Sequence, residues 1–291
     1  MSADIGIILA IVAMLSWGVG DFLIQKSTRS LGNWETLFVI TAFGAVVLLP
    51  FVWSDLPTLF EGGGYLLGVL SFSGAIIFIA ALLEFEALRV GKLSVVEPIW
   101  SLEIPAAALL SYIVIDETLS LAQVLLIVAL IIGLVGVSFR GGKVQARQFL
   151  EKGALISLIA ALCMGAANFY MGLSGRATDS LMANFIACLV MAIVTLIYIL
   201  AKGRWSKMVA DVKAQPGTLL AMSLFDNIAW VAFVAAMTLA PIGIVVALTE
   251  SYIIIVVLLG LMVNKEKLVR HQKLGLIIAV AAAVVLASVS G

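Results

Sequence analysis

Ten long apolar segments constrain this chain more than any other feature of its sequence. A helix of about 20 apolar residues crosses the hydrocarbon core of a bilayer. The segments cover residues 5–25, 35–54, 64–87, 94–114, 120–139, 153–172, 180–200, 217–238, 243–263 and 273–290. The connections between them are short, and most have fewer than about a dozen residues, which leaves no room for a soluble domain. The sequence therefore predicts an all-α polytopic membrane protein with ten transmembrane helices.

The composition agrees with a membrane protein and narrows its chemistry. Hydrophobic residues make up 63% of the 291 residues, more than a water-exposed surface tolerates. Lys+Arg and Asp+Glu balance at 17 each, so no net field attracts nucleic acid. Cys163 and Cys188 lie inside apolar segments and His271, the only histidine, lies in a charged connection. We therefore expect no disulfide, metal or cofactor, and no catalytic constellation of an intramembrane enzyme.

The basic residues predict the orientation of the chain in the membrane. All lysines and arginines except Arg176 lie in or beside the connections that follow the first, third, fifth, seventh and ninth segments. The positive-inside rule places these connections in the cytoplasm. We therefore expect a multi-pass protein of the cell (inner) membrane with both termini outside the cytoplasm. The first segment is too long for a signal peptide and has no basic region before it, so we expect it to be retained.

The second half of the sequence repeats the first. A shift of 147 residues aligns Gly18, Asp21, Phe22, Arg29 and Phe38 with Gly165, Asn168, Phe169, Arg176 and Phe185. A shift of 149 residues aligns Val114, Glu117, Leu119, Gln123 and Leu125 with Val263, Glu266, Leu268, Gln272 and Leu274. Because five helices per half is an odd number, we expect two inverted five-helix halves, residues 1–139 and 153–291, with a cytoplasmic linker at 140–152. Such repeats are typical of secondary transporters with a solute site near the midplane.

Four short motifs point to a known family: Ser16-Trp17-Gly18, Ser101-Leu102-Glu103, Asp116-Glu117-Thr118-Leu119-Ser120 and Asn264-Lys265-Glu266-Lys267-Leu268. With the apolar helices that follow the last two, they resemble the EamA domain of the drug/metabolite transporter superfamily. Glu97 stands where the family usually has a small residue, and Met164 stands where it has tryptophan. The resemblance covers essentially the whole chain. It implies a central cavity, export as the direction, and solutes such as amino acids, other metabolites, nucleosides or drugs.

Carboxylates within the predicted helices are the candidate solute ligands, because ionisable groups in a membrane face a bundle interior or a wet cavity. They are Asp21, Glu84, Glu86, Glu97, Glu103, Asp226 and Glu250. In a continuous helix Glu97 and Ser101 share a face, whereas Glu103 projects almost opposite Ser101. Glu250 is the repeat counterpart of Ser101. We therefore expect Glu97, Ser101 and Glu250 to bind the solute, with Asp226 as a further member. The alternative is that these carboxylates are protonated structural groups between helices.

Other residues complete the predicted site. Trp17, Trp100 and Trp230 lie within helices, where they line the cavity and stack on a solute cation, or else pack in the core or against lipid. Asp21 and Asn168 occupy equivalent positions, and we expect them to form a polar pair or to cap helix ends. Glu117 and Glu266 precede the last helix of each half, so we expect them to complement the dipole of that helix.

The sequence thus predicts a secondary transporter that moves a small polar metabolite, such as an amino acid or another cationic or zwitterionic compound, by alternating access. The acidic candidates suggest protons as the coupling ion. The lack of deep lysine or arginine argues against phosphorylated solutes. A facilitative channel-like permease and a non-transporting membrane assembly protein are the alternatives, and we expect a monomer or homodimer.

Overall fold

The structure is a computed structural model that describes residues 2–90, 99–138, 152–255 and 268–290. In these ranges every regular element is a helix. The elements are α1 (Ser2–Leu31), α2 (Asn33–Val52), η1 (Leu56–Gly64), α3 (Tyr65–Val90), α5 (Glu103–Ile115), α6 (Leu121–Ser138), α7 (Lys152–Ala177), α8 (Ser180–Ala201), α9 (Trp205–Ala214), α10 (Pro216–Leu239), α11 (Ile242–Thr249) and α13 (Arg270–Ser290).

Eight helices of the described ranges are long and apolar enough to cross a membrane: α1, α2, α3, α6, α7, α8, α10 and α13. The fourth and ninth predicted segments, 94–114 and 243–263, lie partly outside the described residues. Their described parts form the shorter helices α5 and α11. A membrane-embedded helical protein is therefore confirmed, whereas the count of ten spans stays a prediction.

The structure differs from the predicted segments at the ends of α1 and α7 and in the connection after the seventh segment. Helix α7 continues beyond the predicted residue 172 to Ala177. Helix α1 runs beyond the predicted range 5–25 to Leu31, where Gly32 follows with a φ of 105° that ends the helix. The connection after the seventh segment also forms a helix, α9, although we expected a loop there. The hydropathy profile did not reveal α9 because only one of its residues, Met208, is buried. A 3.0 Å ion pair between Arg204 and Glu35 also holds this helix against the bundle.

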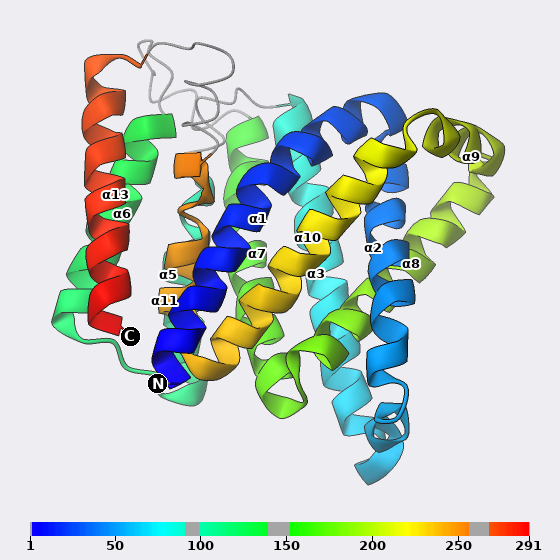
Figure 1. The fold of residues 1–291 in the computed structure, drawn as a ribbon, viewed down its shortest axis with the longest axis horizontal. Coiled ribbons are helices and arrows are strands. Elements are labelled where there is room, and N and C mark those ends of the chain that lie inside the picture. The colour runs from blue at the N-terminus through cyan, green and yellow to red at the C-terminus, as the bar shows by residue number, and fades with distance from the viewer. Residues whose placement is uncertain (1, 91–98, 139–151, 256–267, 291) are drawn as a thin grey trace.

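The helices of the two halves pack against one another rather than forming two separate bundles (Figure 1). α1 packs against α10 and α3 against α7, while α2 pairs with α8 and α6 with α13. Since α1 and α7 are the first helices of their halves, and α3 and α10 the third, the first two contacts are the same contact made twice. Most of the buried core therefore lies between the halves.

A pair of glutamines shows the repeat in atomic detail. Gln123 of α6 donates a 3.3 Å hydrogen bond to Ser290 at the end of α13. Its counterpart Gln272 of α13 donates a 3.2 Å hydrogen bond to the carbonyl of Val137 at the end of α6. The side-chain oxygen of each glutamine also accepts a hydrogen bond from the backbone N–H three residues earlier, at Ser120 and Val269 respectively. The sequence repeat thus corresponds to a repeated, antiparallel contact.

Equivalent helices run in opposite directions. A Cβ added at Gly6, near the start of α1, would lie 3.0 Å from the Cβ of Ala240. Arg176, near the end of α7, donates a 3.1 Å hydrogen bond to the carbonyl of Ala240. The start of α1 and the end of α7 therefore lie together, at what we call the Arg176 end. Gln215, which donates a 2.7 Å hydrogen bond to Ser30, marks the opposite Gln215 end.

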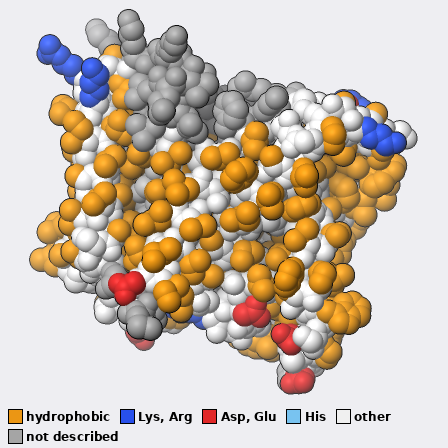
Figure 2. All heavy atoms as spheres, in the orientation of Figure 1, with side chains coloured by type: hydrophobic (Ala, Val, Ile, Leu, Met, Phe, Trp, Pro, Cys, Tyr) orange, Lys and Arg blue, Asp and Glu red, His pale blue; other side chains and the backbone are white. Residues whose placement is uncertain are grey.

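The surface has the zones of a membrane protein (Figure 2). Hydrophobic side chains form a broad band around the middle of the visible face. Lysine and arginine side chains gather along one edge of this band and aspartate and glutamate along the other. Exposed apolar residues such as Val46, Leu121 and Ile277 belong to this surface, each more than half exposed. A band of this kind is stable against lipid rather than water.

Candidate functional site

The fourth and ninth predicted segments are each interrupted by a two-residue turn at equivalent positions. In the first half the turn is Ser101–Leu102, directly before α5, and in the second it is Glu250–Ser251, directly after α11. The shift of 149 residues places one turn on the other. Pro105 accounts for the first break, because it has no N–H to donate to the carbonyl of Ser101 one turn earlier. Irregular backbone at such a depth is tolerated where protein or a cavity surrounds it.

The two breaks bring together two carboxyl groups, one from each half. The side chains of Glu103, the first residue of α5, and Glu250, at the end of α11, lie close enough to interact with each other. Asn168 of α7 donates a 3.3 Å hydrogen bond to Glu103 Oε2. Glu84 of α3 lies near enough to interact electrostatically with Glu103. We call Glu103 and Glu250 the acid pair, and neither carboxylate forms an ion pair with a described lysine or arginine.

Small residues let the neighbouring helices approach the acid pair closely. A Cβ at Gly165 of α7 would lie 2.5 Å from the Cβ of Ala106 and 2.7 Å from the carbonyl oxygen of Glu103. Gly165 therefore sets the contact between α7 and the first turn of α5. Its counterpart Gly18 makes the equivalent contact, where a Cβ would lie 2.7 Å from Cγ2 of Ile255. Asn168 is one helical turn after Gly165, so this contact positions its amide beside Glu103.

A second buried carboxylate lies in an aromatic environment. Asp226 of α10 is 9% exposed, and the indole of Trp17 lies close enough to interact with its carboxylate. Trp17 also meets Trp230, one turn further along α10, edge to face at a centroid distance of 5.2 Å. Phe233 contacts both tryptophan rings at 5.0 and 5.7 Å. Three of the predicted site residues, Trp17, Asp226 and Trp230, thus form one cluster between α1 and α10.

The remaining predicted site residues are distributed differently. Ser101 is buried within the first break, and Trp100, just before it, has an indole N–H without a partner among the described residues. Glu97 lies outside the described residues, as does the side chain of Asp21. The predicted pair of Asp21 and Asn168 therefore has only one described side chain, and that one is bonded to Glu103.

Glu103 was not among the predicted solute-binding residues. The expectation that it projects opposite Ser101 assumed a continuous helix through residues 101–103. The structure has a turn at Ser101–Leu102, and Glu103 directly after it contacts Asn168 and lies beside Glu250. Pro105 was the signal in the sequence, because a proline weakens the helix one turn before it.

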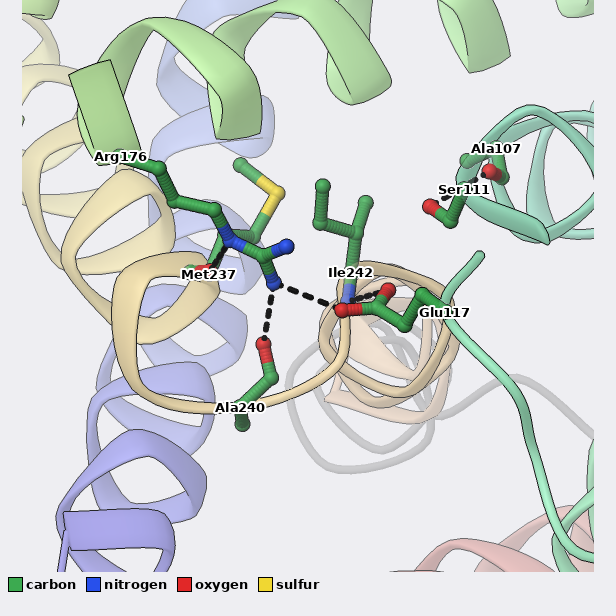
Figure 3. Close-up of polar contacts among 7 residues, drawn as sticks. All are labelled: Ala107, Ser111, Glu117, Arg176, Met237, Ala240 and Ile242. Atoms are coloured by element: carbon green, nitrogen blue, oxygen red, sulfur yellow. Dashed lines mark hydrogen bonds and ion pairs between the residues drawn. The ribbon is translucent and has the colours of Figure 1, made fainter. Parts of the chain in front are cut away.

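At the Arg176 end, a polar network joins the two halves (Figure 3). Arg176 forms a 2.8 Å ion pair with Glu117 and donates through Nε to the carbonyl of Met237 at 2.7 Å. The other Glu117 oxygen accepts a 2.7 Å hydrogen bond from the N–H of Ile242, the first residue of α11. We expected Glu117 to complement the dipole of the helix that follows it. It instead caps a helix of the other half.

Two hollows in the described part of the molecule lie away from the acid pair. One, of about 470 Å³, is polar and lies beside the network at the Arg176 end, lined by Gly175, Arg176, Thr178, Asp179, Ser180 and Thr238. The other, of about 370 Å³, is apolar and lies between α1, α2, α8 and α10. Neither hollow is lined by Glu103 or Glu250. Among the described residues, no three His, Cys, Asp or Glu side chains form a group that could hold a metal ion.

Comparisons with known proteins agree with this architecture. One solved structure, described only as "Crystal structure of protein", superposes with a TM-score of 0.76 over 98% of this chain and 97% of its own, at 15% sequence identity. At that identity the likeness extends to the fold alone. No curated protein sequence matches the chain. The model of the EamA-like transporter family matches residues 4–139 and again residues 151–288. The chain, with its two repeats, therefore belongs to the EamA-like transporter family, a family of membrane transporters and not of enzymes.

Proposed function

We propose that this protein is a secondary transporter that exports a small polar metabolite by alternating access around the acid pair. In this proposal two inverted five-helix halves, residues 1–139 and 153–291, move against each other, and residues 140–152 link them in the cytoplasm. The transporter works as a monomer or homodimer. Family membership supports transport as the activity, and the acid pair supports the mechanism and the solute class.

The contact between Glu103 and Glu250 carries the proposal. Two carboxylates in contact inside a membrane protein are stable only when a cation, which can be a proton, is shared between them. One carboxylate comes from each half, at the breaks of two helices that meet between the halves. A relative movement of the halves therefore changes the distance between the carboxylates and, with it, their affinity for a cation.

This chemistry favours a cationic or zwitterionic solute that exchanges with protons. The ammonium group of an amino acid or amine can replace a proton between Glu103 and Glu250, so the two cations compete for one site. Asp226 with Trp17 and Trp230 offers a second acidic and aromatic surface suited to a cation. We keep Glu97, Ser101 and Trp100 as solute-binding candidates near the first break, and Asp21 with Asn168 as a polar pair.

The charge distribution supports the proposed orientation. Lysine and arginine mark one edge of the hydrophobic band (Figure 2), and basic connections face the cytoplasm in most membrane proteins. We therefore place the Arg176 end outside the cytoplasm, together with both termini, in the cell (inner) membrane. Labelling single cysteines at the termini with an impermeant reagent on intact cells tests this placement, and termini that react only after lysis would reverse it.

The main experiment measures solute flux in proteoliposomes. A panel of radiolabelled amino acids and amines is assayed with and without a pH gradient. We expect saturable solute flux, and we expect a proton gradient directed opposite to that flux to accelerate it. Glu103→Gln and Glu250→Gln should lower the gradient-driven flux at least about tenfold, the effect of losing a hydrogen-bonded charge. Glu97→Gln tests the third carboxylate in the same assay.

The matched control is Glu61→Gln, which removes an exposed carboxylate on η1 and should leave flux unchanged. Wild-type flux in the Glu103→Gln and Glu250→Gln variants would reject the site. Flux that does not saturate would indicate a channel-like permease instead. If no solute of the panel moves in either direction, a membrane assembly role would replace transport as the leading hypothesis.

A further inference from the structure

Helices α5 and α11 connect the acid pair with the polar network at the Arg176 end. α5 begins at Glu103 and ends at Ile115, two residues before Glu117. α11 begins at Ile242, whose N–H donates to Glu117, and ends directly before Glu250. One helix from each half thus runs between the same two places, in opposite directions. We call Arg176, Glu117 and the backbone of Met237, Ala240 and Ile242 the Arg176 latch.

The two helices are packed tightly between these ends. A Cβ at Gly243 would lie 2.8 Å from the Cβ of Ala108. Ser111, in the second half of α5, is 1% exposed, and its hydroxyl donates to the carbonyl of Ala107 in its own helix. A direct route from the acid pair toward the Arg176 end runs between α5 and α11. The packing of Gly243 against Ala108 closes this route.

The latch joins the halves through charged and backbone groups that water can also satisfy. Glu117 belongs to the first half, and its partners Arg176 and Ile242 belong to the second. The ion pair is partly accessible, with side chains 29% and 14% exposed. It borders the polar hollow lined by Thr178 and Asp179. Separation of the halves at this end would expose these groups to solvent rather than to lipid, so the latch can open at modest cost.

Arg176 is also the one basic residue outside the five basic connections. A positive charge on that side opposes the distribution that sets the orientation of the chain. Three groups of the protein hold its guanidinium: the Glu117 carboxylate and the carbonyls of Met237 and Ala240. These carbonyls end α10, the helix that carries Asp226 and Trp230. Arg176 thus joins the end of α7 to the end of α10, and its partner Glu117 joins both to the start of α11.

We propose that the Arg176 latch is the gate on this side of the membrane, and that it breaks whenever the acid pair opens toward the Arg176 end. The proposal rests on the alternating-access function proposed above. α11 is eight residues long, about 12 Å at the rise of an α-helix, and it is buried along its whole length. A helix this short and well packed moves as a unit, so release of Ile242 at one end shifts Glu250 at the other.

The test measures access to the path between α5 and α11. Ser111→Cys is introduced after replacing Cys163 and Cys188 by serine, and the protein is placed in vesicles of known orientation. An impermeant maleimide is then added from one side at a time. Glu117→Gln and Arg176→Gln should label about three to ten times faster from the Arg176 side only, the effect of losing a partly exposed ion pair with its hydrogen bonds.

Two further variants separate a gate from a general loss of structure. Exchanging the charges, with Glu117→Arg and Arg176→Glu together, should slow labelling again relative to either single charge loss. Arg176→Lys keeps the charge but loses the forked donor, so its labelling rate should fall between those of wild type and Arg176→Gln. The control Glu35→Gln breaks the Arg204 ion pair at the other end and should not change labelling from the Arg176 side.

Unchanged labelling in Glu117→Gln and Arg176→Gln would overturn the gate, and so would faster labelling from both sides or in the Glu35→Gln control. Because labelling needs no solute, these outcomes are independent of the flux assay. Saturable flux with unchanged labelling rejects the latch alone. Latch-dependent labelling without flux of any solute rejects the transport proposal while the opening movement stands.

Discussion

The contact at Gly165 gives a sharp test of the packing around the acid pair. In Gly165→Ala, the new Cβ would lie 2.5 Å from the Cβ of Ala106 and 2.7 Å from the carbonyl oxygen of Glu103. Carbon atoms normally approach to about 3.5–4.0 Å, so α7 and α5 must move apart by about 1 Å. Overpacking of this kind costs about 1–3 kcal/mol. The upper part of the range applies here because one neighbour is backbone, which cannot rotate away.

Gly68→Ala provides the matched control, since a Cβ at Gly68 of α3 would meet nothing within 4 Å. Both variants gain the same helix propensity, about 1 kcal/mol. The difference between their free energies of unfolding therefore equals the overpacking cost, about 1–3 kcal/mol. Thermal unfolding in detergent, followed by loss of the monodisperse size-exclusion peak, measures the order of stability.

A compensating variant adds a second check. Adding Ala106→Gly to Gly165→Ala removes the 2.5 Å contact but leaves the one to the carbonyl of Glu103, so part of the lost stability should return. If Gly165→Ala is as stable as Gly68→Ala, the close contact between α7 and α5 is not present in the protein. Gradient-driven flux should fall in Gly165→Ala even where the protein is folded, because the movement separates Asn168 from Glu103.

Three smaller changes test other parts of the structure by the same unfolding assay. Gly18→Ala should cost less than Gly165→Ala, because the new Cβ meets only the side chain of Ile255; an equal or larger cost would contradict the contact. Asp179→Ala should lose about 1 kcal/mol, because Asp179 caps α8 by accepting from the N–H groups of Leu181 and Met182 at 2.8 and 3.0 Å. Asp116→Gly should raise stability by a few tenths to about 1 kcal/mol, because Asp116 has a φ of 53°, and a decrease would show that its side chain matters more than its backbone strain.

The sequence predicted what depends on local patterns. Runs of apolar residues gave eight spans that the structure contains, because each span must satisfy its own backbone in the membrane. The repeat, read from residues such as Gln123 and Gln272, predicted contacts that occur twice. Hydropathy and repeat spacing are properties of the sequence itself, and no knowledge of neighbouring helices is needed to find them.

The two features that carry the proposals depend on distant residues. The acid pair joins positions 147 residues apart, and the helix break that allows it lay hidden behind the assumption of a continuous helix. Arg176 was visible as the exception to the positive-inside pattern, but its partner Glu117 is 59 residues away. A charge out of place indicates that a partner exists, whereas only the packing of α5 against α11 shows which residue that partner is.

The symmetry of the scaffold and the asymmetry of its residues have different consequences for transport. The repeat makes some contacts twice, such as those of Gly18 and Gly165. In the proposed alternating access, such contacts stabilise the outward-open and inward-open states about equally and therefore favour neither state. The acid pair is different, because the counterparts of Glu103 and Glu250 are Tyr252 and Ser101. Each half therefore contributes one acid of the pair, at a position where the other half has a hydroxyl side chain. In the proposed mechanism, the repeated contacts permit reversible opening, and the residues in which the halves differ set the preferred pose of the solute.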